Sequence, residues 1–322
     1  MLASTRELRI ETSTVCSYRC VMCPRERLAR PHQIMPFALF ELIVNRCLED
    51  RPNLDYCTVS GFGEALLDPG WQEKLAFARQ RFRTVHVVTT LGTVEHGQLA
   101  DLAELASEVR VSMGGVDDAT YAAVHRPQTP VSFREIETRV LSLLALRKSG
   151  LRVILTCCAV SPMQPVLGQW IDRWKHLADE VEVWRPHNWV NGRAYRTPSP
   201  TRMTSCGRPE AGPIQVQVDG TVNVCCFDFN GDTEIGDLRV KRLAEILDGQ
   251  AMRRFRTLHA KGQADSLPTC RVCDQRDPPE RKQEHLLFSS RDKLLRVQQT
   301  SSGHEVMGLD SRGAEPPVGQ FH

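Results

Sequence analysis

The chain has 322 residues, of which 41% are hydrophobic and 25% charged, and its formal net charge is +2. This length suits one large domain plus a smaller one, and the nearly balanced charge excludes the basic field that attracts nucleic acid or a membrane surface. The first residues lack the apolar core of a signal peptide, and no apolar run approaches the roughly 20 residues of a membrane span. We therefore expect a cytoplasmic protein that binds neither nucleic acid nor membrane.

The first 190 residues alternate short β-rich runs with amphipathic stretches of helical length. The expected strands are residues 8–15, 56–61, 85–90, 108–113, 151–160 and 180–185. The expected helices lie between them, at residues 37–47, 71–82, 98–105, 133–146 and 166–177. Such alternation implies a parallel sheet with right-handed crossovers, as in barrel-like α/β folds. In those folds the active site forms at the carboxyl ends of the strands.

A Pro- and Ser-containing stretch at residues 195–202 predicts a domain boundary. After it, residues 213–218 and 221–224 are typical of a hairpin, and residues 243–258 carry one helical pattern. The chain then becomes polar, and we expect residues from about 298 onward to be poorly ordered. The predicted domains are residues 1–195, 196–280 and a partly disordered extension, 281–322.

The chain contains twelve cysteines, which without a secretory signal favour metal binding or catalysis over disulfides. Three of them, Cys16, Cys20 and Cys23, follow the first expected strand with the spacing C-x3-C-x2-C. A tetrahedral metal or a cubic iron–sulfur cluster needs four ligands, so three thiolates on one loop leave one coordination position open. The alternatives are a zinc knuckle that a distant residue completes, and cysteines that are merely buried.

This triplet resembles the signature of the radical S-adenosylmethionine (SAM) superfamily. The resemblance implies that the three cysteines hold a 4Fe–4S cluster whose unligated iron binds SAM. It also implies that reduction of this cluster cleaves SAM to a 5′-deoxyadenosyl radical, which abstracts hydrogen from an unactivated carbon. Tyr18 and Met22 fit the motif, in which an aromatic or apolar side chain shields the adenine of SAM.

Three further segments, each after an expected strand, resemble the family in the right order. Ser60-Gly-Phe-Gly-Glu64 is similar to the family's Gly-Gly-Glu-Pro, in which glycine admits SAM close to the backbone and a carboxylate can accept from its ammonium. On its own this segment is equally typical of a Gly-rich turn. Val88-Thr-Thr-Leu-Gly92 is similar to Thr-Asn-Gly, and Ser112-Met-Gly-Gly is similar to Ser-Leu-Asp-Gly.

The sequence departs from these patterns at three positions, Ala65, Leu91 and Gly114. These departures leave open a zinc-bound scaffold or partner-binding module that descends from such an enzyme. The residues that the resemblance implies as SAM contacts are Tyr18, Met22, Gly61, Gly63, Glu64, Thr90 and Ser112.

Five more cysteines fall in the last third of the chain: Cys206, Cys225, Cys226, Cys270 and Cys273. Cysteines on a hairpin followed by a C-x2-C knuckle are also typical of a zinc ribbon. Their order resembles the SPASM extension of radical SAM proteins in its shortened form, the twitch domain. The resemblance implies one auxiliary 4Fe–4S cluster held by Cys206, Cys225, Cys270 and Cys273. The implied fold class is α/β: a partial (β/α)6 TIM-like barrel with a C-terminal twitch domain.

The final third is similar to dehydrogenases and epimerases of aminoglycoside biosynthesis. In such epimerases a cysteine thiol returns hydrogen to the opposite face of the substrate radical, and Cys226 directly follows the implied ligand Cys225. We therefore expect epimerisation of a sugar, aminoglycoside or peptide carbon in antibiotic or other secondary metabolism, with Cys226 as catalytic hydrogen donor. The alternative for Cys226 is packing beneath the auxiliary cluster.

The alternative reaction is oxidation of a secondary alcohol of an aminocyclitol or aminoglycoside, with the auxiliary cluster as electron acceptor. Both reactions imply two 4Fe–4S clusters and SAM as cofactors. Both also imply a flavodoxin- or ferredoxin-type reductant as partner.

Several residues permit two interpretations each. Cys157 and Cys158 end an expected strand, so one of them faces the barrel interior, where it is either a competing hydrogen donor or simply buried. His125 and Arg126 either meet SAM or substrate or form a solvated pair. Cys47 and Cys57 are interpreted as core. The loop at residues 184–193 either braces the two domains or binds substrate through Trp184, Arg185, His187, Asn188, Trp189 and Arg193.

Overall fold

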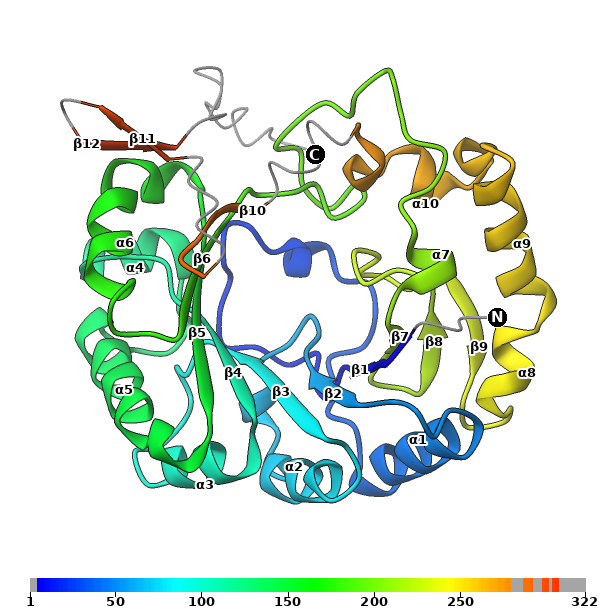
Figure 1. Ribbon diagram of the computed structural model, residues 1–322, viewed down its shortest axis with the longest axis horizontal. Coiled ribbons are helices and arrows are strands. Elements are labelled where there is room, and N and C mark those ends of the chain that lie inside the picture. The colour runs from blue at the N-terminus through cyan, green and yellow to red at the C-terminus, as the bar shows by residue number, and fades with distance from the viewer. Residues whose placement is uncertain (1–4, 279–285, 292–296, 301–302, 307–322) are drawn as a thin grey trace.

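The computed structural model describes residues 5–278, 286–291, 297–300 and 303–306, without the side chains of residues 148–149, 297–300 and 303–306. Six parallel strands pair in chain order and curve into an open barrel, with helices on its outer side (Figure 1). The strands are β1 (Glu7–Ile10), β2 (Tyr56–Val59), β3 (Thr84–Thr89), β4 (Glu108–Ser112), β5 (Arg152–Cys158) and β6 (Glu180–Trp184). The helices are α1 (Phe37–Asp50), α2 (Trp71–Arg79), α3 (Gln98–Leu105), α4 (Asp118–His125), α5 (Phe133–Ala145) and α6 (Leu167–Trp174).

All six expected strands and all five expected helices of the barrel are present at or near the predicted residues. Strand β1 ends at Ile10 rather than at residue 15, which frees residues 11–15 to form the start of a long loop. Helix α4 was not expected. It begins with a capping box, in which the Asp117 carboxylate accepts from the Thr120 backbone N–H and the Thr120 hydroxyl accepts from the Asp117 N–H.

The strands place apolar side chains outward and polar side chains inward. In β4, for example, Val109 and Val111 are fully buried against the helices, whereas Arg110 and Ser112 on the opposite face are only partly buried. Because side chains alternate along a strand, the inner face of the barrel, called the lumen here, is lined mainly by polar groups. The hydrophobic core therefore lies between the sheet and the outer helices.

The sheet continues beyond the barrel into the C-terminal region. Strand β7 (Ile214–Val216) pairs in parallel with β1, and β8 (Thr221–Asn223) and β9 (Glu234–Asp237) follow antiparallel. At the other edge β10 (Leu286–Ser289) pairs antiparallel with β6, which completes one sheet of ten strands. The predicted hairpin is confirmed as β7–β8. The two regions on either side of the predicted boundary near residue 195 both contribute strands to this sheet.

The C-terminal region is mainly helical outside the sheet. Its helices are α7 (Arg208–Ala211), α8 (Leu243–Leu247), α9 (Gln250–Ala260) and α10 (Pro268–Arg271). The expectation of one helix over residues 243–258 was wrong, because Gly249 adopts an extended conformation (φ −70°, ψ 162°) and separates α8 from α9. The stretch at 195–202 is packed rather than loose: Arg196 pairs with Asp274, and the Ser199 N–H donates to the Asp277 carboxylate.

Short 3-10 helices connect these elements: η1 (Pro24–Arg27), η2 (Ala65–Leu67), η3 (Leu146–Ser149), η4 (Ser161–Val166), η5 (Ala264–Ser266) and η6 (Asp274–Arg276). We expected poor order from about residue 298; instead β11 (Val297–Thr300) and β12 (Gly303–Val306) pair antiparallel. Residues 307–322 lie outside the described residues. In the part of the chain that the structure describes, every helix is too short or too polar to cross a membrane.

Candidate metal centres

The first three cysteines lie on the loop that follows β1. This loop runs through the space that the curved sheet encloses (Figure 1). Burial raises the pKa of the Cys16 thiol to about 11, and the nearby Glu64 carboxylate adds to the shift. Burial also raises the pKa of Cys20, followed by the charges of Cys23 and Cys16. The three sulfur atoms therefore lie within electrostatic range of one another. Iron supplies the positive charge that stabilises neighbouring thiolates, so this donor set fits an iron–sulfur cluster.

The cysteine loop is held from one side by the end of α4. The Val21 N–H donates to the Val124 carbonyl at 2.9 Å, and the Arg19 N–H donates to the Arg126 carbonyl at 3.2 Å. A third bond runs from the Gln128 N–H to a loop carbonyl at 2.7 Å. These main-chain hydrogen bonds resemble those between two paired strands. They fix the backbone of the cysteine loop against the end of α4.

The loop after β6 holds the cysteine loop from the other side. Trp189 Nε1 donates to the Met22 carbonyl at 2.7 Å, and Arg193 Nε donates to the Val21 carbonyl at 3.0 Å. The Tyr195 hydroxyl donates to the same Val21 carbonyl at 2.8 Å. Of the two interpretations of residues 184–193, the bracing one therefore describes Trp189 and Arg193.

Asn188 also braces the chain rather than facing a ligand. Its side-chain oxygen accepts from the Tyr195 and Arg196 N–H groups, its amide nitrogen donates to the Arg196 carbonyl, and its backbone N–H donates to Asp274. His187 packs among aromatic rings, with its ring centroid 4.0 Å from that of Trp189 and 4.5 Å from that of Phe227.

Glu64 forms four hydrogen bonds within the chain. Its Oε1 accepts from the Thr89 hydroxyl at 2.7 Å and from the Leu66 N–H at 3.3 Å. Its Oε2 accepts from the Thr90 N–H and hydroxyl, both at 2.8 Å. A carboxylate offers about four acceptor positions, so these four bonds leave none for a SAM ammonium. Glu64 instead ties the loop after β2 to the end of β3, and Thr90 is buried in that contact.

Gly61 and Gly63 admit the chain's own loop rather than open space. A Cβ on Gly61 would lie 2.2 Å from Glu11 Cγ, and a Cβ on Gly63 would lie 2.3 Å from the Ser13 carbonyl oxygen. The Glu64 N–H next to it donates to the Val15 carbonyl at 2.8 Å. The two glycines thus let the loop after β2 pack directly beneath residues 11–15, the segment that leads into Cys16.

We expect Gly63→Ala to destabilise the protein by about 1–3 kcal/mol, because the added methyl group meets backbone atoms that cannot rotate away. Gly97→Ala is the matched control, since a Cβ there would have no atom within 4 Å. Thermal unfolding of both variants checks the prediction, and equal melting temperatures would contradict it.

Glu11 joins the loop, the barrel and the C-terminal region at one buried point. Its carboxylate is paired with Arg30 through bonds of 2.6 and 3.0 Å. It also accepts from the Phe62 N–H at 2.9 Å and from the Val218 N–H, beyond β7, at 3.2 Å. Glu11 is 1% exposed, so its charge depends on these four hydrogen bonds from three partners.

The remaining expected SAM contacts, Tyr18, Met22 and Ser112, differ in their surroundings. Tyr18 is 2% exposed, and its hydroxyl accepts from the Tyr121 hydroxyl at 3.0 Å, so its ring supports the loop from beneath rather than facing a ligand. Met22 is partly buried against the core. Ser112, at the end of β4, is partly buried on the lumen face, which suits the predicted contact.

The four later cysteines line one cavity of about 400 Å³. Cys206 precedes α7, Cys225 follows β8, and Cys270 and Cys273 lie in and after α10. Burial raises the pKa of Cys270 and Cys273 to about 12. Within the described residues, neither this cavity nor any other place brings three His, Cys, Asp or Glu side chains together so that they could hold a single metal ion. Four thiols around one cavity match the ligand number of a cubic iron–sulfur cluster.

Arg208 brings a positive charge to this second set. Burial alone would lower its pKa, but the nearby Cys226, Cys225 and Cys206 sulfur atoms raise it. Its guanidinium lies 4.5 Å from the centre of the Phe227 ring. Cys226 is thus close to Arg208, although it is not among the residues that line the cavity.

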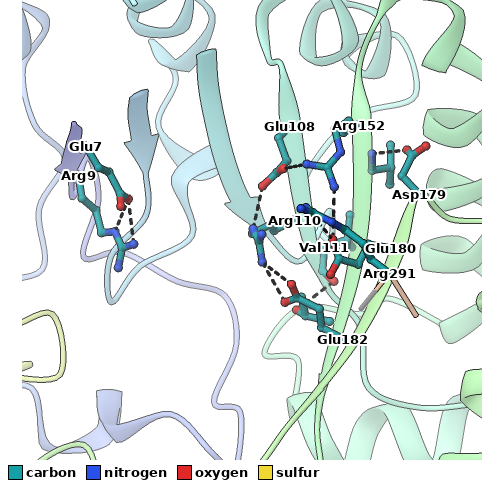
Figure 2. A network of polar contacts seen from close by, with 12 residues as sticks. Glu7, Arg9, Glu108, Arg110, Val111, Arg152, Asp179, Glu180, Glu182 and Arg291 are labelled. Carbon is teal, nitrogen blue, oxygen red and sulfur yellow. Dashed lines mark hydrogen bonds and ion pairs between the residues drawn. The ribbon is translucent and has the colours of Figure 1, made fainter. Parts of the chain in front are cut away.

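The lumen carries an ion-pair network across β4, β5 and β6 (Figure 2). Arg110 bonds to Glu108 and to Glu182, both at 2.9 Å. Arg152 bonds to Glu108 at 2.8 Å and to Glu180 at 3.3 Å. The three carboxylates are almost fully buried while both arginines remain partly exposed, so the lumen is polar but largely charge-compensated.

The mouth of the lumen offers an aromatic surface and a thiol. Trp184 is 38% exposed, and its Nε1 donates to Glu182 Oε2 at 2.8 Å, which fixes the indole. Cys158 lies opposite Trp184 on the neighbouring strand β5, on the lumen face, whereas Cys157 is buried on the outer face. Cys47 and Cys57 are fully buried, as expected of core residues.

Comparison with known proteins adds two findings. Residues 206–274 match the SPASM family, described as an iron–sulfur cluster-binding domain. Among curated proteins, none matches the sequence significantly.

Solved structures of similar fold include BtrN in complex with AdoMet and 2-DOIA, with a TM-score of 0.59 and 17% identity over 84% of this chain and 93% of that one. They also include anSMEcpe with bound AdoMet (0.61, 16%, covering 83% and 87%) and Streptococcus suis SuiB bound to precursor peptide SuiA (0.60, 11%, covering 84% and 71%).

The BtrN and anSMEcpe structures both contain AdoMet, which is SAM. The matched domain supports an iron–sulfur cluster in residues 206–274 of this chain. Cys16, Cys20 and Cys23 share one loop and remain the predicted ligands of the first cluster. Cys206, Cys225, Cys270 and Cys273 line one cavity and remain the predicted ligands of the second. The chain therefore shares the α/β fold of these AdoMet-bound structures and carries, in residues 206–274, an iron–sulfur cluster-binding domain of the SPASM family.

Proposed function

We propose that this protein is a radical SAM epimerase that inverts one carbon of a sugar or aminoglycoside, or of a peptide. The observation that carries the proposal is the pair Cys225–Cys226. Cys225 lines the four-cysteine cavity, while its neighbour Cys226 lies outside that lining and is only partly buried. This difference supports Cys225 as a cluster ligand and Cys226 as the hydrogen donor.

SAM and its reduced cluster, when bound, supply the radical that removes hydrogen from one face of the substrate carbon. Cys226 then gives its hydrogen atom to the other face: the S–H bond breaks, the C–H bond forms, and a sulfur radical remains. One electron and one proton restore the thiol. We propose that a reductant of the flavodoxin or ferredoxin class supplies them.

Trp184 supports a sugar or aminoglycoside ring as the substrate. Its indole is exposed at the mouth of the lumen and held in place by Glu182. A fixed, flat aromatic face suits the apolar face of a sugar ring, and the surrounding polar lumen suits its hydroxyl groups. Trp189, the other candidate, is used in bracing the cysteine loop.

Cys158 is the competing donor. It faces the lumen beside Trp184, and burial raises its pKa to about 12, so it stays in the S–H form at neutral pH. Cys158→Ala is therefore the matched control for Cys226→Ala, because each removes one thiol and leaves the proposed cluster ligands in place.

We expect Cys226→Ala to cleave SAM but to form epimer only at background level, because the substrate radical has no hydrogen donor. The test incubates wild type and both variants, reduced, in deuterated water with a panel of aminoglycosides and aminocyclitols. Wild type should place one solvent deuterium at the inverted carbon, and Cys158→Ala should do the same. Full epimer formation by Cys226→Ala would contradict the assignment, and its loss in Cys158→Ala alone would transfer the role to Cys158.

The second candidate function is oxidation of a secondary alcohol. Two observations favour it: the fold is similar to that of BtrN in complex with AdoMet and 2-DOIA, and the Arg208 cation lies beside the second cysteine set. A neighbouring positive charge makes it easier to add an electron to a group that these cysteines hold. A ketone product without solvent deuterium, unchanged in Cys226→Ala, would support oxidation over epimerisation.

A further inference from the structure

We propose that His125 donates a hydrogen bond from Nδ1–H to Cys20 Sγ and so raises the reduction potential of the SAM-binding cluster. This rests on the cluster assignment within the proposed function, but not on the reaction that the enzyme performs. The sequence offered two interpretations of His125: a solvated surface group, or a contact for SAM or substrate. Neither describes its position in the structure. It is the last residue of α4 and is 0% exposed.

The hydrogen-bond partners of the ring determine which nitrogen carries the proton. The Gly114 backbone N–H lies 2.7 Å from His125 Nε2, and a backbone N–H can only donate. Nε2 must therefore be the unprotonated acceptor. In neutral imidazole the proton is then on Nδ1, which lies 3.4 Å from Cys20 Sγ.

The surroundings hold the ring in this orientation. Its centroid lies 4.8 Å from that of Tyr121 in a tilted stack, and the edge-on Tyr18 ring is 6.1 Å away. The neighbouring backbone pairs Val124 with Val21, next to Cys20. The donor and the sulfur are thus fixed relative to each other by both side-chain packing and main-chain bonds.

Gly114 takes part in this arrangement. A Cβ at this position would lie 3.0 Å from Val124 Cγ1 and 3.4 Å from His125 Nε2, which is closer than most real contacts. Gly114 is also a position at which this sequence departs from the Ser-Leu-Asp-Gly pattern. Glycine there both donates to the imidazole and leaves room for it.

The direction of the effect follows from charge. Reduction adds an electron to the cluster and increases negative charge on its sulfur atoms. A hydrogen bond to a ligating thiolate stabilises that extra charge, so it makes the potential less negative. His125→Phe keeps most of the buried volume but removes the donor. We therefore expect it to shift the potential of the SAM-binding cluster to more negative values.

His259 provides the matched control. Its Nε2 lies 3.5 Å from Cys270 Sγ, and its Nδ1 lies 3.0 Å from the Ser205 hydroxyl, so it is a buried histidine beside the other cysteine set. A hydroxyl both donates and accepts, so this tautomer is not determined as that of His125 is. His259→Phe should leave the potential of the SAM-binding cluster unchanged.

The experiment is an anaerobic redox titration of the full, cluster-loaded chain, followed by electron paramagnetic resonance. The SAM-binding cluster is recognised as the signal that changes when SAM is added, and the auxiliary cluster serves as an internal reference. His125→Phe should shift the potential of the SAM-binding cluster only. His125→Asn should shift it less, because its amide nitrogen can take the place of Nδ1 as the donor. An unchanged potential in His125→Phe would overturn the proposal.

A measurement on the wild-type chain removes any dependence on folding of the variant. With ¹⁵N-labelled histidine, the SAM-sensitive signal should show nuclear coupling to one histidine nitrogen, and the coupling should persist in His259→Phe. Its absence would also overturn the proposal. If iron analysis shows no SAM-binding cluster at all, the proposed function fails instead, so the two failures are distinguishable.

Discussion

Cys20→Ala is expected to lower the iron content from about eight to about four atoms per chain and to abolish SAM cleavage. Cys20 is the middle one of the three predicted ligands. Its loss leaves only two thiolates for a cluster that already lacks a fourth cysteine ligand. Iron analysis and the release of 5′-deoxyadenosine after reduction with dithionite measure the two effects.

Two other cysteine variants make this result specific. Cys270→Ala removes a thiol from the second set, so it should lose a similar amount of iron but retain the signal that responds to SAM. Cys57→Ala removes a fully buried thiol on the outer face of β2 and should keep both iron and cleavage, with some loss of stability. Full iron content in Cys20→Ala would show that this loop does not hold a cluster.

Glu11→Gln is expected to lower the free energy of unfolding by about 3–5 kcal/mol and the melting temperature by roughly 10 °C. The neutral amide leaves the guanidinium of Arg30, itself largely buried, without its counter-charge. An amide also has one acceptor oxygen where the carboxylate uses two, so at least one of the Phe62 and Val218 N–H groups loses its partner. Thermal unfolding by circular dichroism under anaerobic conditions measures the change.

Glu7→Gln is the control, four residues earlier on β1. Glu7 pairs with Arg9 at 2.9 Å, but both side chains are about a quarter exposed, so solvent screens the pair and its loss should cost at most about 1 kcal/mol. The double variant Glu11→Gln/Arg30→Met should recover part of the loss, since it removes the unpaired charge. Equal effects at Glu7 and Glu11 would refute the argument from burial.

The barrel was predictable because its signals are local. Apolar periodicity is a property of each segment by itself, so the positions of β2 to β6 and of α1, α3 and α5 followed from the sequence within a few residues. Helix α4 has only eight residues, and its one local signal was the Asp117–Thr120 capping box. The break between α8 and α9 depends on the backbone of a single glycine, Gly249, within an otherwise continuous pattern.

The roles of individual site residues were less predictable, because they depend on partners far along the chain. The spacing of the cysteines predicts two metal centres. It gives no sign that Glu64 bonds to Thr89 and Thr90, or that Glu11 meets Arg30 and Val218. His125 resembled a surface residue because nothing in its own segment shows that α4 ends against Cys20, 105 residues earlier.

The pairing of β1 with β7 means that the cluster-binding C-terminal region is not an exchangeable cassette. Residues 8–10 bond to β2 on one side and to residues 214–216 on the other, so β1 is an interior strand of the sheet. A truncation at residue 195 would leave its main-chain groups as a bare edge, prone to pairing with other chains. Grafting this region onto another barrel would therefore require a compatible first strand, and not only a suitable linker.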